Sequence, residues 1–350
     1  SLHGISAQIK ADRDRGFFRL FADRAFSMKG FGTIVTGTVT GGSVSSGMEV
    51  ELLPGVTTAK IRGLQSHGKA VDKVTLGDRA AVNVSQIDKA VLKRGSQLAQ
   101  KGFLKPSRVI GVTLSLLERT GRSLKHQQRV RLHIGTEEVL GRVFFVENGK
   151  KNCEAGQTSI ALLRLEESVA VAVEDPFILR FYSPAETIGG GKIIDPAPPA
   201  RFKEARPWLE SLSGKTIQER LTMFFRQSAN HPLTLSGWTR RWQTSAEKFK
   251  SESGYLKILQ FGNIADPFIT LKSLIEGQLE NYLQIVERSL KQRSIRRGVP
   301  LEDLRKSLGF SRPLFDWLSD LLEKEEKIQV ESGNVTLTGY TIILSSEHAA

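Results

Sequence analysis

Short runs of alternating hydrophobic and polar residues fill the chain up to about residue 195. Runs such as FFRLFADRAF, TIVTGTVTGG and MEVELLPG are separated by Gly, Asn, Asp and Pro. Short strands with turn residues between them are typical of antiparallel sheets. The segment GFLKPS at 102–107 interrupts the series, and a second series follows it. The pattern therefore predicts two antiparallel β-barrels.

Helical periodicity replaces the alternation after the proline-rich segment IIDPAPPARF at 193–202, which we expect to be a stiff linker. Two amphipathic helices are predicted by apolar residues that recur on one helix face. Their apolar faces consist of Leu221, Phe224 and Phe225 in the first helix, and of Leu279, Tyr282, Leu283, Val286 and Leu290 in the second.

The end of the chain predicts a winged helix. A helix that ends at Gly309, a helix capped by Ser311 and a two-stranded ribbon that turns at SGN follow one another. This is the order of elements in a winged helix, and the same order is visible more faintly between 216 and 272. We therefore expect a multidomain chain of two barrels followed by α/β winged helices, with boundaries at 1–101, 102–196, 197–274 and 275–350.

Composition points to a partner of opposite charge. Fifty Lys and Arg face 37 Asp and Glu, a formal net charge of +13, and the excess lies mainly before residue 199. Such a balance attracts nucleic acid, although it can also serve solubility alone. Cys153 is the only cysteine, which excludes an internal disulfide and disfavours a structural zinc site. With no long apolar run and no secretion signal, we expect a cytoplasmic protein without a membrane partner.

Three glycine-rich segments are candidates for phosphate sites. GFGTIVTGT at 30–38 has no lysine where a P-loop requires one and leads into a strand, so we assign its glycines to a turn and a bulge. SGKT at 213–216 lacks the first P-loop glycine, and we expect Thr216 to cap a helix instead. TIGGGKIIDP at 187–196 is either an anion nest or, more simply, a bend. An Asn-Lys-x-Asp element is also missing, so we expect no nucleotide domain, no catalytic residue and no metal site.

A family resemblance rests on several of these segments together. FADRAF and GFGTIVTGTVTGGSVSSGMEVELLPG closely resemble the second domain of translational GTPases of the EF-Tu type. LQSHGK at 64–69, LKRG at 92–95 and ETIGGGKIIDPAPP at 186–199, followed by winged helices, narrow this to the family of selenocysteine-specific elongation factors (SelB). The resemblance is strong over 16–199 and only architectural beyond it.

The resemblance implies a carrier of selenocysteinyl-tRNA that delivers its cargo to the ribosome at recoded UGA codons. The family has a GTPase domain, two barrels and usually four winged helices, so this chain resembles a middle fragment. The resemblance also implies that GTP and Mg²⁺ are bound by a missing domain and that this chain is no enzyme. It further implies that absent C-terminal modules bind the messenger hairpin. We expect a monomer.

Discrimination between selenocysteine and serine has a simple physical basis. A selenol is an anion at neutral pH whereas a serine hydroxyl is not, so a cationic, partly desolvated pocket separates them. The resemblance places Arg24 and Arg94 in that pocket with Asp23 to orient them, and His67 is a plausible lining residue. Without the resemblance, Asp23 and Arg24 would be a surface pair and Arg94 a turn residue. Phe26 either packs on the aminoacyl group or terminal adenosine, or belongs to the barrel core.

Two basic segments are candidates for contact with RNA phosphates. The second barrel contains RSLKHQQRVRLHIG, and the superfamily uses this barrel against the tRNA arm; a solvated charged face is the plainer alternative. Its candidate tRNA-binding residues are Arg122, Lys125, His126, Arg129 and Arg131. The second segment, SLKQRSIRRG, precedes the last winged helix and offers Lys291, Arg293, Arg296 and Arg297 as RNA-binding residues.

Other functions remain open from the residues alone. A different EF-Tu-like translation factor would share the first barrel but not the winged helices. A winged-helix nucleic-acid-binding regulator would need a basic recognition helix, whereas SRPLFDWLSDLLEKEEK is acidic over its second half.

Overall fold

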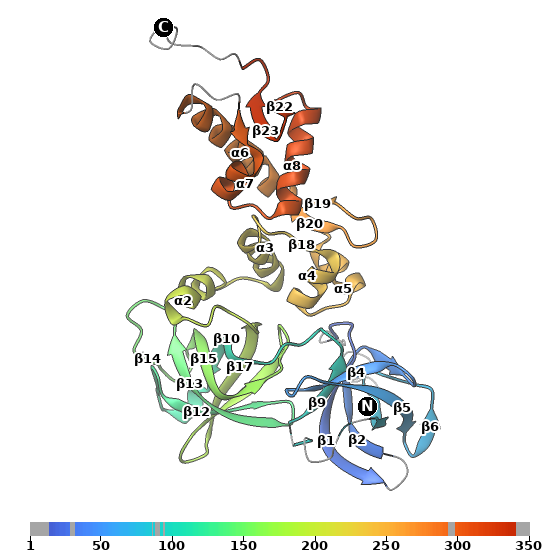
Figure 1. Ribbon diagram of the computed structural model, residues 1–350. Coiled ribbons are helices and arrows are strands. Elements are labelled where there is room, and N and C mark those ends of the chain that lie inside the picture. The colour runs from blue at the N-terminus through green and yellow to red at the C-terminus, as the bar shows by residue number, and fades with distance from the viewer. Residues whose placement is uncertain are drawn as a thin grey trace, which may run out of the picture. The chain divides into compact units, whose positions relative to one another are not determined.

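The computed structural model describes residues 14–28, 32–85, 87, 92–93, 95–292 and 298–340. The chain forms two compact units. One consists of Ser1–Lys215 with Thr239–Phe249, and the other of Thr216–Trp238 with Lys250–Ala350. The first unit contains the barrels and the second contains most of the helices (Figure 1).

Six strands close the first barrel in the order β4-β9-β1-β2-β8-β5, because β5 also pairs with β4. Strand β6 extends the sheet at β5, and β3 pairs with β7 in a separate ribbon. The bounds are β1 (Arg19–Met28), β2 (Gly32–Gly41), β3 (Ser43–Ser45), β4 (Glu49–Leu53), β5 (Thr57–Ser66), β6 (Lys69–Val71), β7 (Lys73–Thr75), β8 (Arg79–Val84) and β9 (Gln97–Gln100).

Strand β2 explains the glycines of the segment 30–38. Its residues alternate between the core and the outside, and Val35 and Val39 are buried. At Gly37 a Cβ atom would lie 2.1 Å from the carbonyl oxygen of Phe21 on β1, so only glycine allows this approach of the two strands. The register of β1 against β2 shifts between Ala22 and Arg24, so this bulge lies on β1 and not at the glycines of 30–38, to which the sequence analysis assigned it.

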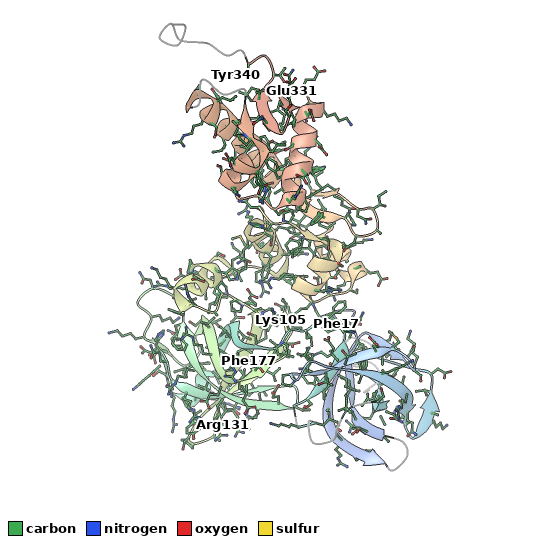
Figure 2. All side chains as sticks on the ribbon, in the orientation of Figure 1. Phe17, Lys105, Arg131, Phe177, Glu331 and Tyr340 are labelled. Carbon is green, nitrogen blue, oxygen red and sulfur yellow. The ribbon has the colours of Figure 1, made fainter. Side chains whose placement is uncertain are left out.

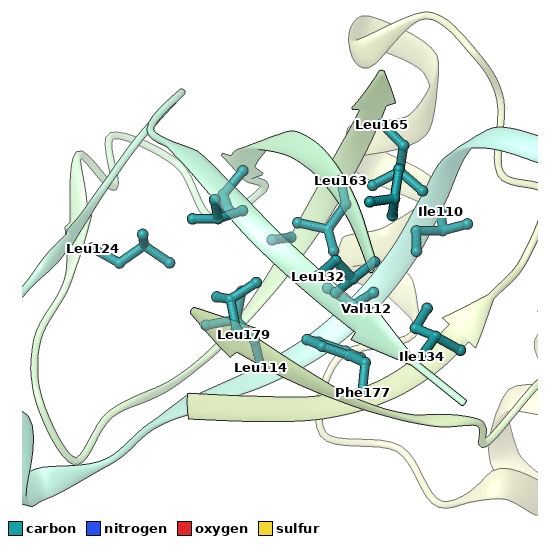
Figure 3. Close-up of a cluster of buried hydrophobic side chains, with 14 of the residues drawn as sticks. Ile110, Val112, Leu114, Leu124, Leu132, Ile134, Leu163, Leu165, Phe177 and Leu179 are labelled. Atoms are coloured by element: carbon teal, nitrogen blue, oxygen red, sulfur yellow. The ribbon is translucent and has the colours of Figure 1, made fainter. Parts of the chain in front are cut away.

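The second barrel is closed by six strands in the order β10-β15-β13-β12-β16-β17. Their inward side chains form one apolar cluster that includes Val112, Leu132, Leu163 and Phe177 (Figure 3). The bounds are β10 (Ser107–Leu116), a 3₁₀ turn η2 (Glu118–Thr120), β11 (Leu124–Lys125), β12 (Arg129–Ile134), β13 (Glu137–Phe145), β14 (Asn152–Cys153), β15 (Thr158–Val169), β16 (Pro176–Phe181) and β17 (Thr187–Asp195).

The glycines at 189–191 lie inside β17 and form neither a nest nor a bend. A Cβ at Gly189 or Gly191 would lie about 2 Å from a carbonyl oxygen of β10, at 2.2 and 1.8 Å respectively. At Gly190 the carbonyl of Phe177 on β16 would be 2.4 Å away. These glycines therefore let three strands approach closely.

A buried polar network joins the two barrels. The Arg19 guanidinium, 7% exposed, donates to both carboxylate oxygens of Asp175 at 2.7 Å. It also donates to the Gln97 side chain at 2.7 Å and to the carbonyl of Ala170 at 3.1 Å. Phe17, Leu104 and other apolar residues form a small core beside it. Because its hydrogen bonds are satisfied, the buried charge is tolerated, whereas removing one partner would cost about 3–5 kcal/mol.

The segment Thr239–Phe249 belongs to the barrel unit although it lies far along the chain. Gln243 accepts a hydrogen bond from the Val173 amide at 2.9 Å and donates to the Val171 carbonyl at 2.8 Å. Arg15 donates to the carbonyls of Trp242 and Gln243 at 2.7 and 3.1 Å. This segment is thus hydrogen-bonded to both barrels.

Helix α2 (Phe202–Ser211) follows the proline-rich linker and packs on the second barrel. A Cβ at Gly111 of β10 would lie 2.4 Å from the Leu209 side chain. The carboxylate of Asp195, which is fully buried, accepts hydrogen bonds from Trp208 at 2.7 Å and from Arg241 at 3.2 Å.

The helical half repeats one order of elements twice, as predicted for winged helices. Each repeat contains three helices and a three-stranded sheet, ordered β18-β20-β19 in the first and β21-β23-β22 in the second. The bounds are α3 (Ile217–Gln227), β18 (Leu233–Thr234), α4 (Leu235–Trp242), α5 (Ala246–Ser253), β19 (Ile258–Phe261), β20 (Phe268–Leu271), α6 (Lys272–Gln292), β21 (Val299–Pro300), α7 (Leu301–Leu308), α8 (Arg312–Lys324), β22 (Ile328–Glu331) and β23 (Asn334–Leu337).

The predicted helix signals are largely confirmed. Thr216 caps α3 in a capping box, and Gly309 ends α7 in the left-handed conformation. Ser311 stands at the N-cap of α8, but its side chain makes no capping hydrogen bond. Tyr282 and Val286 of α6 are buried as expected. The predicted domain boundaries stay predictions.

Candidate functional site

The bulge in β1 sets the geometry of the predicted pocket. Ala22 pairs with Gly37 of β2 and Arg24 pairs with Thr36, so Asp23 is the extra residue on β1. Consecutive residues at a bulge no longer alternate strictly between the two faces of the sheet. As a result, Asp23 is half-buried and Arg24 is exposed.

Asp23 forms an ion pair with Arg79, a residue that the sequence analysis missed. The Arg79 guanidinium contacts one carboxylate oxygen, and the hydroxyl of Thr36 donates to the other at 2.8 Å. The Arg79 side chain is 57% exposed and that of Asp23 is 28% exposed, so the guanidinium can still reach a ligand. Arg79 is the first residue of β8, opposite Thr38 of β2. Its outward position follows from the alternation in RAAVNV, but its closeness to Asp23 depends on strand register.

His67 is linked to Arg79 through Ser66. His67 is exposed in the turn between β5 and β6, where it adopts a left-handed backbone conformation. The Ser66 hydroxyl lies 3.1 Å from His67 Nδ1 and 3.2 Å from the carbonyl oxygen of Arg79. The structure thus connects two of the predicted residues, Asp23 and His67, by way of Arg79.

The structure tests the predicted placement of Phe26 but not that of Arg94. Phe26 is 40% exposed on β1, which decides against a place in the barrel core. Arg94 lies outside the described residues. Next to it, Lys93 and Ser96 form a tight turn in which each backbone amide is hydrogen-bonded to the other residue. The predicted role of Arg94 stays a prediction.

Three arginines form a row across the outside of the second barrel. Arg129 on β12 pairs with Arg142 on β13, and Arg142 pairs with Arg164 on β15. We call these residues the arginine row. Like charges directly opposite each other destabilise a sheet unless counter-charges or ligands lie nearby.

Carboxylates and aromatic rings compensate part of this charge. Arg129 donates two hydrogen bonds of 2.7 Å to Glu166, which lowers the pKa of the glutamate, and its guanidinium lies 4.3 Å from the Tyr182 ring centroid. The Arg164 guanidinium lies 4.8 Å from the centroid of the Phe144 ring. Arg142 donates to the carbonyl of Gln127 at 3.0 Å. Among the described residues, neither Arg142 nor Arg164 is in an ion pair.

The other predicted tRNA-binding residues are scattered around this row. Arg131 lies on the outside of the barrel in Figure 2 and is paired with Glu138 at 2.5 Å. Arg122 lies 3.6 Å from Glu186, and Lys125 is exposed on β11.

His126 is held by the barrel itself. Its Nδ1 accepts a hydrogen bond from the Phe145 amide at 3.2 Å, and its ring meets those of Phe144 and Phe202 edge-on. These contacts give the ring a packing role.

Lys291 is exposed near the end of α6 and is paired with Glu287 at 2.6 Å. The remaining predicted RNA-binding residues, Arg293, Arg296 and Arg297, lie outside the described residues.

A half-buried acid of the second barrel lies against Gly95 of the first. Glu137 begins β13, and burial, with a smaller contribution from the charge of Glu167, raises its pKa to about 7. A Cβ at Gly95 would lie 2.7 Å from the Glu137 Cβ. No cluster of three or more potential metal ligands occurs in the described parts of the chain. None of the helices in those parts is long and apolar enough to cross a membrane.

Known families match both barrels. Residues 32–99 match the family described as Elongation factor Tu domain 2, and residues 111–200 match Selenocysteine-specific elongation factor, beta-barrel domain. Among solved structures, that of the bacterial selenocysteine-specific elongation factor EF-Sec has a TM-score of 0.71 at 19% identity. It covers 96% of this chain and 52% of the other, and it supports the fold.

Curated relatives carry the same description. The selenocysteine-specific elongation factor of Desulfomicrobium baculatum is 30% identical over 355 residues, which is 99% of this chain and 55% of the relative. That of Escherichia coli (strain K12) is 29% identical over 200 residues, 56% of this chain and 30% of the relative. The chain therefore spans about half the length or less of these relatives. Two matched barrel families and a relative aligned along almost the whole chain show that this chain belongs to the family of selenocysteine-specific elongation factors.

Proposed function

We propose that the outer face of the first barrel binds the aminoacyl end of selenocysteinyl-tRNA, as part of a factor that delivers this tRNA to the ribosome at recoded UGA codons. The observation that carries the proposal is the Asp23–Arg79 ion pair beside Arg24 on the β1 bulge. Asp23 neutralises the charge of Arg79, and the exposed Arg24 next to it in the chain keeps a positive charge for an anionic ligand.

Charge is the property that separates the two cargoes. The selenolate of selenocysteine would be attracted by Arg24 and Arg79, and the attraction grows as the bound aminoacyl group displaces water. Serine has no such charge. Asp23 holds Arg79 in place by a charge-assisted contact and reduces the repulsion between the guanidinium groups. The turn at His67, attached to Arg79 through Ser66, would close one side of the pocket.

The arginine row would contact the tRNA backbone. Arg142 and Arg164 are exposed and point outward from neighbouring strands. Phosphate contacts of this kind position a nucleic acid without reading its sequence. The second barrel would therefore bind the tRNA backbone while the first barrel binds the aminoacyl end.

The remaining expectations from the sequence are part of this proposal. We assign no catalytic step, metal ion or nucleotide to this chain, and we expect GTP and Mg²⁺ to be bound by a GTPase domain. We also expect a cytoplasmic monomer, with the messenger hairpin bound by other modules of the factor.

Binding of the two charged forms of one tRNA tests the pocket. Selenocysteinyl-tRNA and seryl-tRNA with the same tRNA body would be titrated against the native chain and its Arg24→Ala and Arg79→Ala variants. Each substitution removes a charge-assisted contact, so we expect affinity for selenocysteinyl-tRNA to fall about 10- to 100-fold, and affinity for seryl-tRNA to change much less. Arg94→Ala tests the sequence prediction in the same assay.

Arg119→Ala is the matched control, because Arg119 is an exposed arginine of the second barrel outside both proposed surfaces. It should leave the ratio of the two affinities unchanged. Equal losses for both cargoes in Arg24→Ala and Arg79→Ala would reject the pocket.

A further inference from the structure

The turn between β12 and β13 of the second barrel contacts the first barrel at two places, on β1 just before the bulge and at Gly95. This turn consists of Gly135 and Thr136, and Glu137 follows as the first residue of β13. We call residues 135–137 the brace.

Thr136 contacts β1 immediately before the bulge. Its hydroxyl donates a hydrogen bond of 2.9 Å to the carbonyl oxygen of Ala22. That carbonyl belongs to the peptide group whose N–H is that of Asp23. The amide of Ala22 donates a hydrogen bond, also of 2.9 Å, to the carbonyl of Ser96 within the first barrel. Thr136 thus fixes the orientation of the peptide from which the bulge begins.

Gly135 and Glu137 complete the contact. A Cβ at Gly135 would lie 2.4 Å from the ring of Phe21, so the turn lies directly against that ring. Glu137 also lies close to Gly95, where a Cβ would approach its Cα, Cβ and Cγ atoms within 2.9 Å. Gly95 follows the LKRG residue Arg94 in the chain. Three consecutive residues of the second barrel therefore contact β1 and Gly95, which belong to two of the three segments with predicted pocket residues.

We propose that the brace is a specificity-determining support: through Thr136 on β1 and Glu137 against Gly95, the second barrel positions the anion pocket of the first. This rests on the proposed function, because it assigns a role to the same site. The physical reason is that a guanidinium separates a selenolate from a hydroxyl only at short range. A displacement of β1 by a fraction of an ångström weakens that contact while leaving phosphate contacts elsewhere intact.

Thr136→Val tests the brace, because it keeps the shape of the side chain and removes the donor to Ala22. We expect the preference for selenocysteinyl-tRNA over seryl-tRNA to fall about three- to tenfold, with affinity for the seryl form nearly unchanged. Thr136→Ser restores the hydroxyl and should restore the preference. Thr113→Val is the matched control, since the Thr113 hydroxyl also donates to a backbone carbonyl, that of Lys192, but within the second barrel alone.

Amide hydrogen exchange gives a second measurement that needs no tRNA. We expect the amides of Asp23, Arg24 and Ala25 to exchange faster in Thr136→Val than in the native chain, and Thr113→Val to leave them unchanged. A full preference in Thr136→Val, or an equal loss in Thr136→Ser, would overturn the proposal. If the native chain shows no preference for selenocysteinyl-tRNA over seryl-tRNA, the proposed function fails. Hydrogen exchange in Thr136→Val then decides about the brace alone. Unchanged exchange in β1 would reject the brace, and faster exchange would confirm that it supports the bulge.

Discussion

Single residues decide how much charge each surface presents. On the first barrel, Asp23 neutralises one guanidinium and leaves Arg24 exposed beside it. On the second barrel, Glu166 is paired with Arg129, while Arg142 and Arg164 keep their charge available. Each surface therefore combines paired arginines, which hold the local structure, with arginines that can bind an anion.

Glu137 should make stability depend on pH near neutrality. Its pKa in the folded chain is about 7, above the value of 4.5 of an ordinary glutamate, so the folded state binds this proton more tightly than the unfolded state. The stabilisation is complete below the unfolded value and is lost as pH rises through 7. Between pH 5 and pH 8 the native chain should lose on the order of 2–3 kcal/mol through this group. Chemical denaturation at several pH values measures the loss.

Glu137→Gln should have a flatter pH profile over this range. Glu138→Gln is the control, because Arg131 lowers the pKa of the exposed Glu138, whose contribution is lost only in acid. Identical profiles for Glu137→Gln and the native chain would contradict the assignment.

At the scale of elements, the pairing of β1 with β2 creates the site. Alternation in the sequence was enough to predict both strands, and it places Val35 and Val39 inward. The bulge at Asp23 was not predicted, because the sequence analysis assigned a bulge to the glycines of 30–38 instead. Register was not predictable, because it depends on which strands meet across the closed barrel. For this reason Arg79, 56 positions after Asp23 in the sequence, was missed although it is the closest counter-charge.

Gly37→Ala should damage this pair of strands. The new Cβ would lie 2.1 Å from the Phe21 carbonyl, a distance that forces β1 and β2 apart. We expect a loss of about 2–4 kcal/mol in the free energy of unfolding, together with the loss of selective binding. Thermal and urea denaturation measure the first effect.

Gly63→Ala supplies the comparison, since Gly63 is a strand glycine of the same barrel. A Cβ atom added there would meet no atom of the described residues within 4 Å. The substitution should change the free energy of unfolding by less than about 1 kcal/mol. Similar losses in both variants would show that close approach at Gly37 is not what requires the glycine.

At the scale of the whole molecule, the net charge of +13 predicts salt-sensitive binding of RNA. If Arg142 and Arg164 each contact one phosphate, replacing either by alanine should reduce the slope of log affinity against log salt by about 1. Arg312→Ala, on the exposed surface of the acidic helix α8, should leave the slope unchanged. A native affinity that does not vary with salt would exclude the phosphate contacts.

The architecture was more predictable than its internal joints. Alternation of hydrophobic and polar residues predicted the two barrels, and helix caps such as Thr216 and Gly309 predicted the order of elements in the winged helices. The links through Arg19 and Gln243 carry no local signal, because each pairs with residues 70 or more positions away.

The hydrogen bonds of Gln243 also constrain how such a gene can be divided. A protein cut after the second barrel would lose the partners of Val171, Val173 and Arg15. Exchange of the first winged helix between relatives by recombination would therefore have to carry matching barrel residues with it.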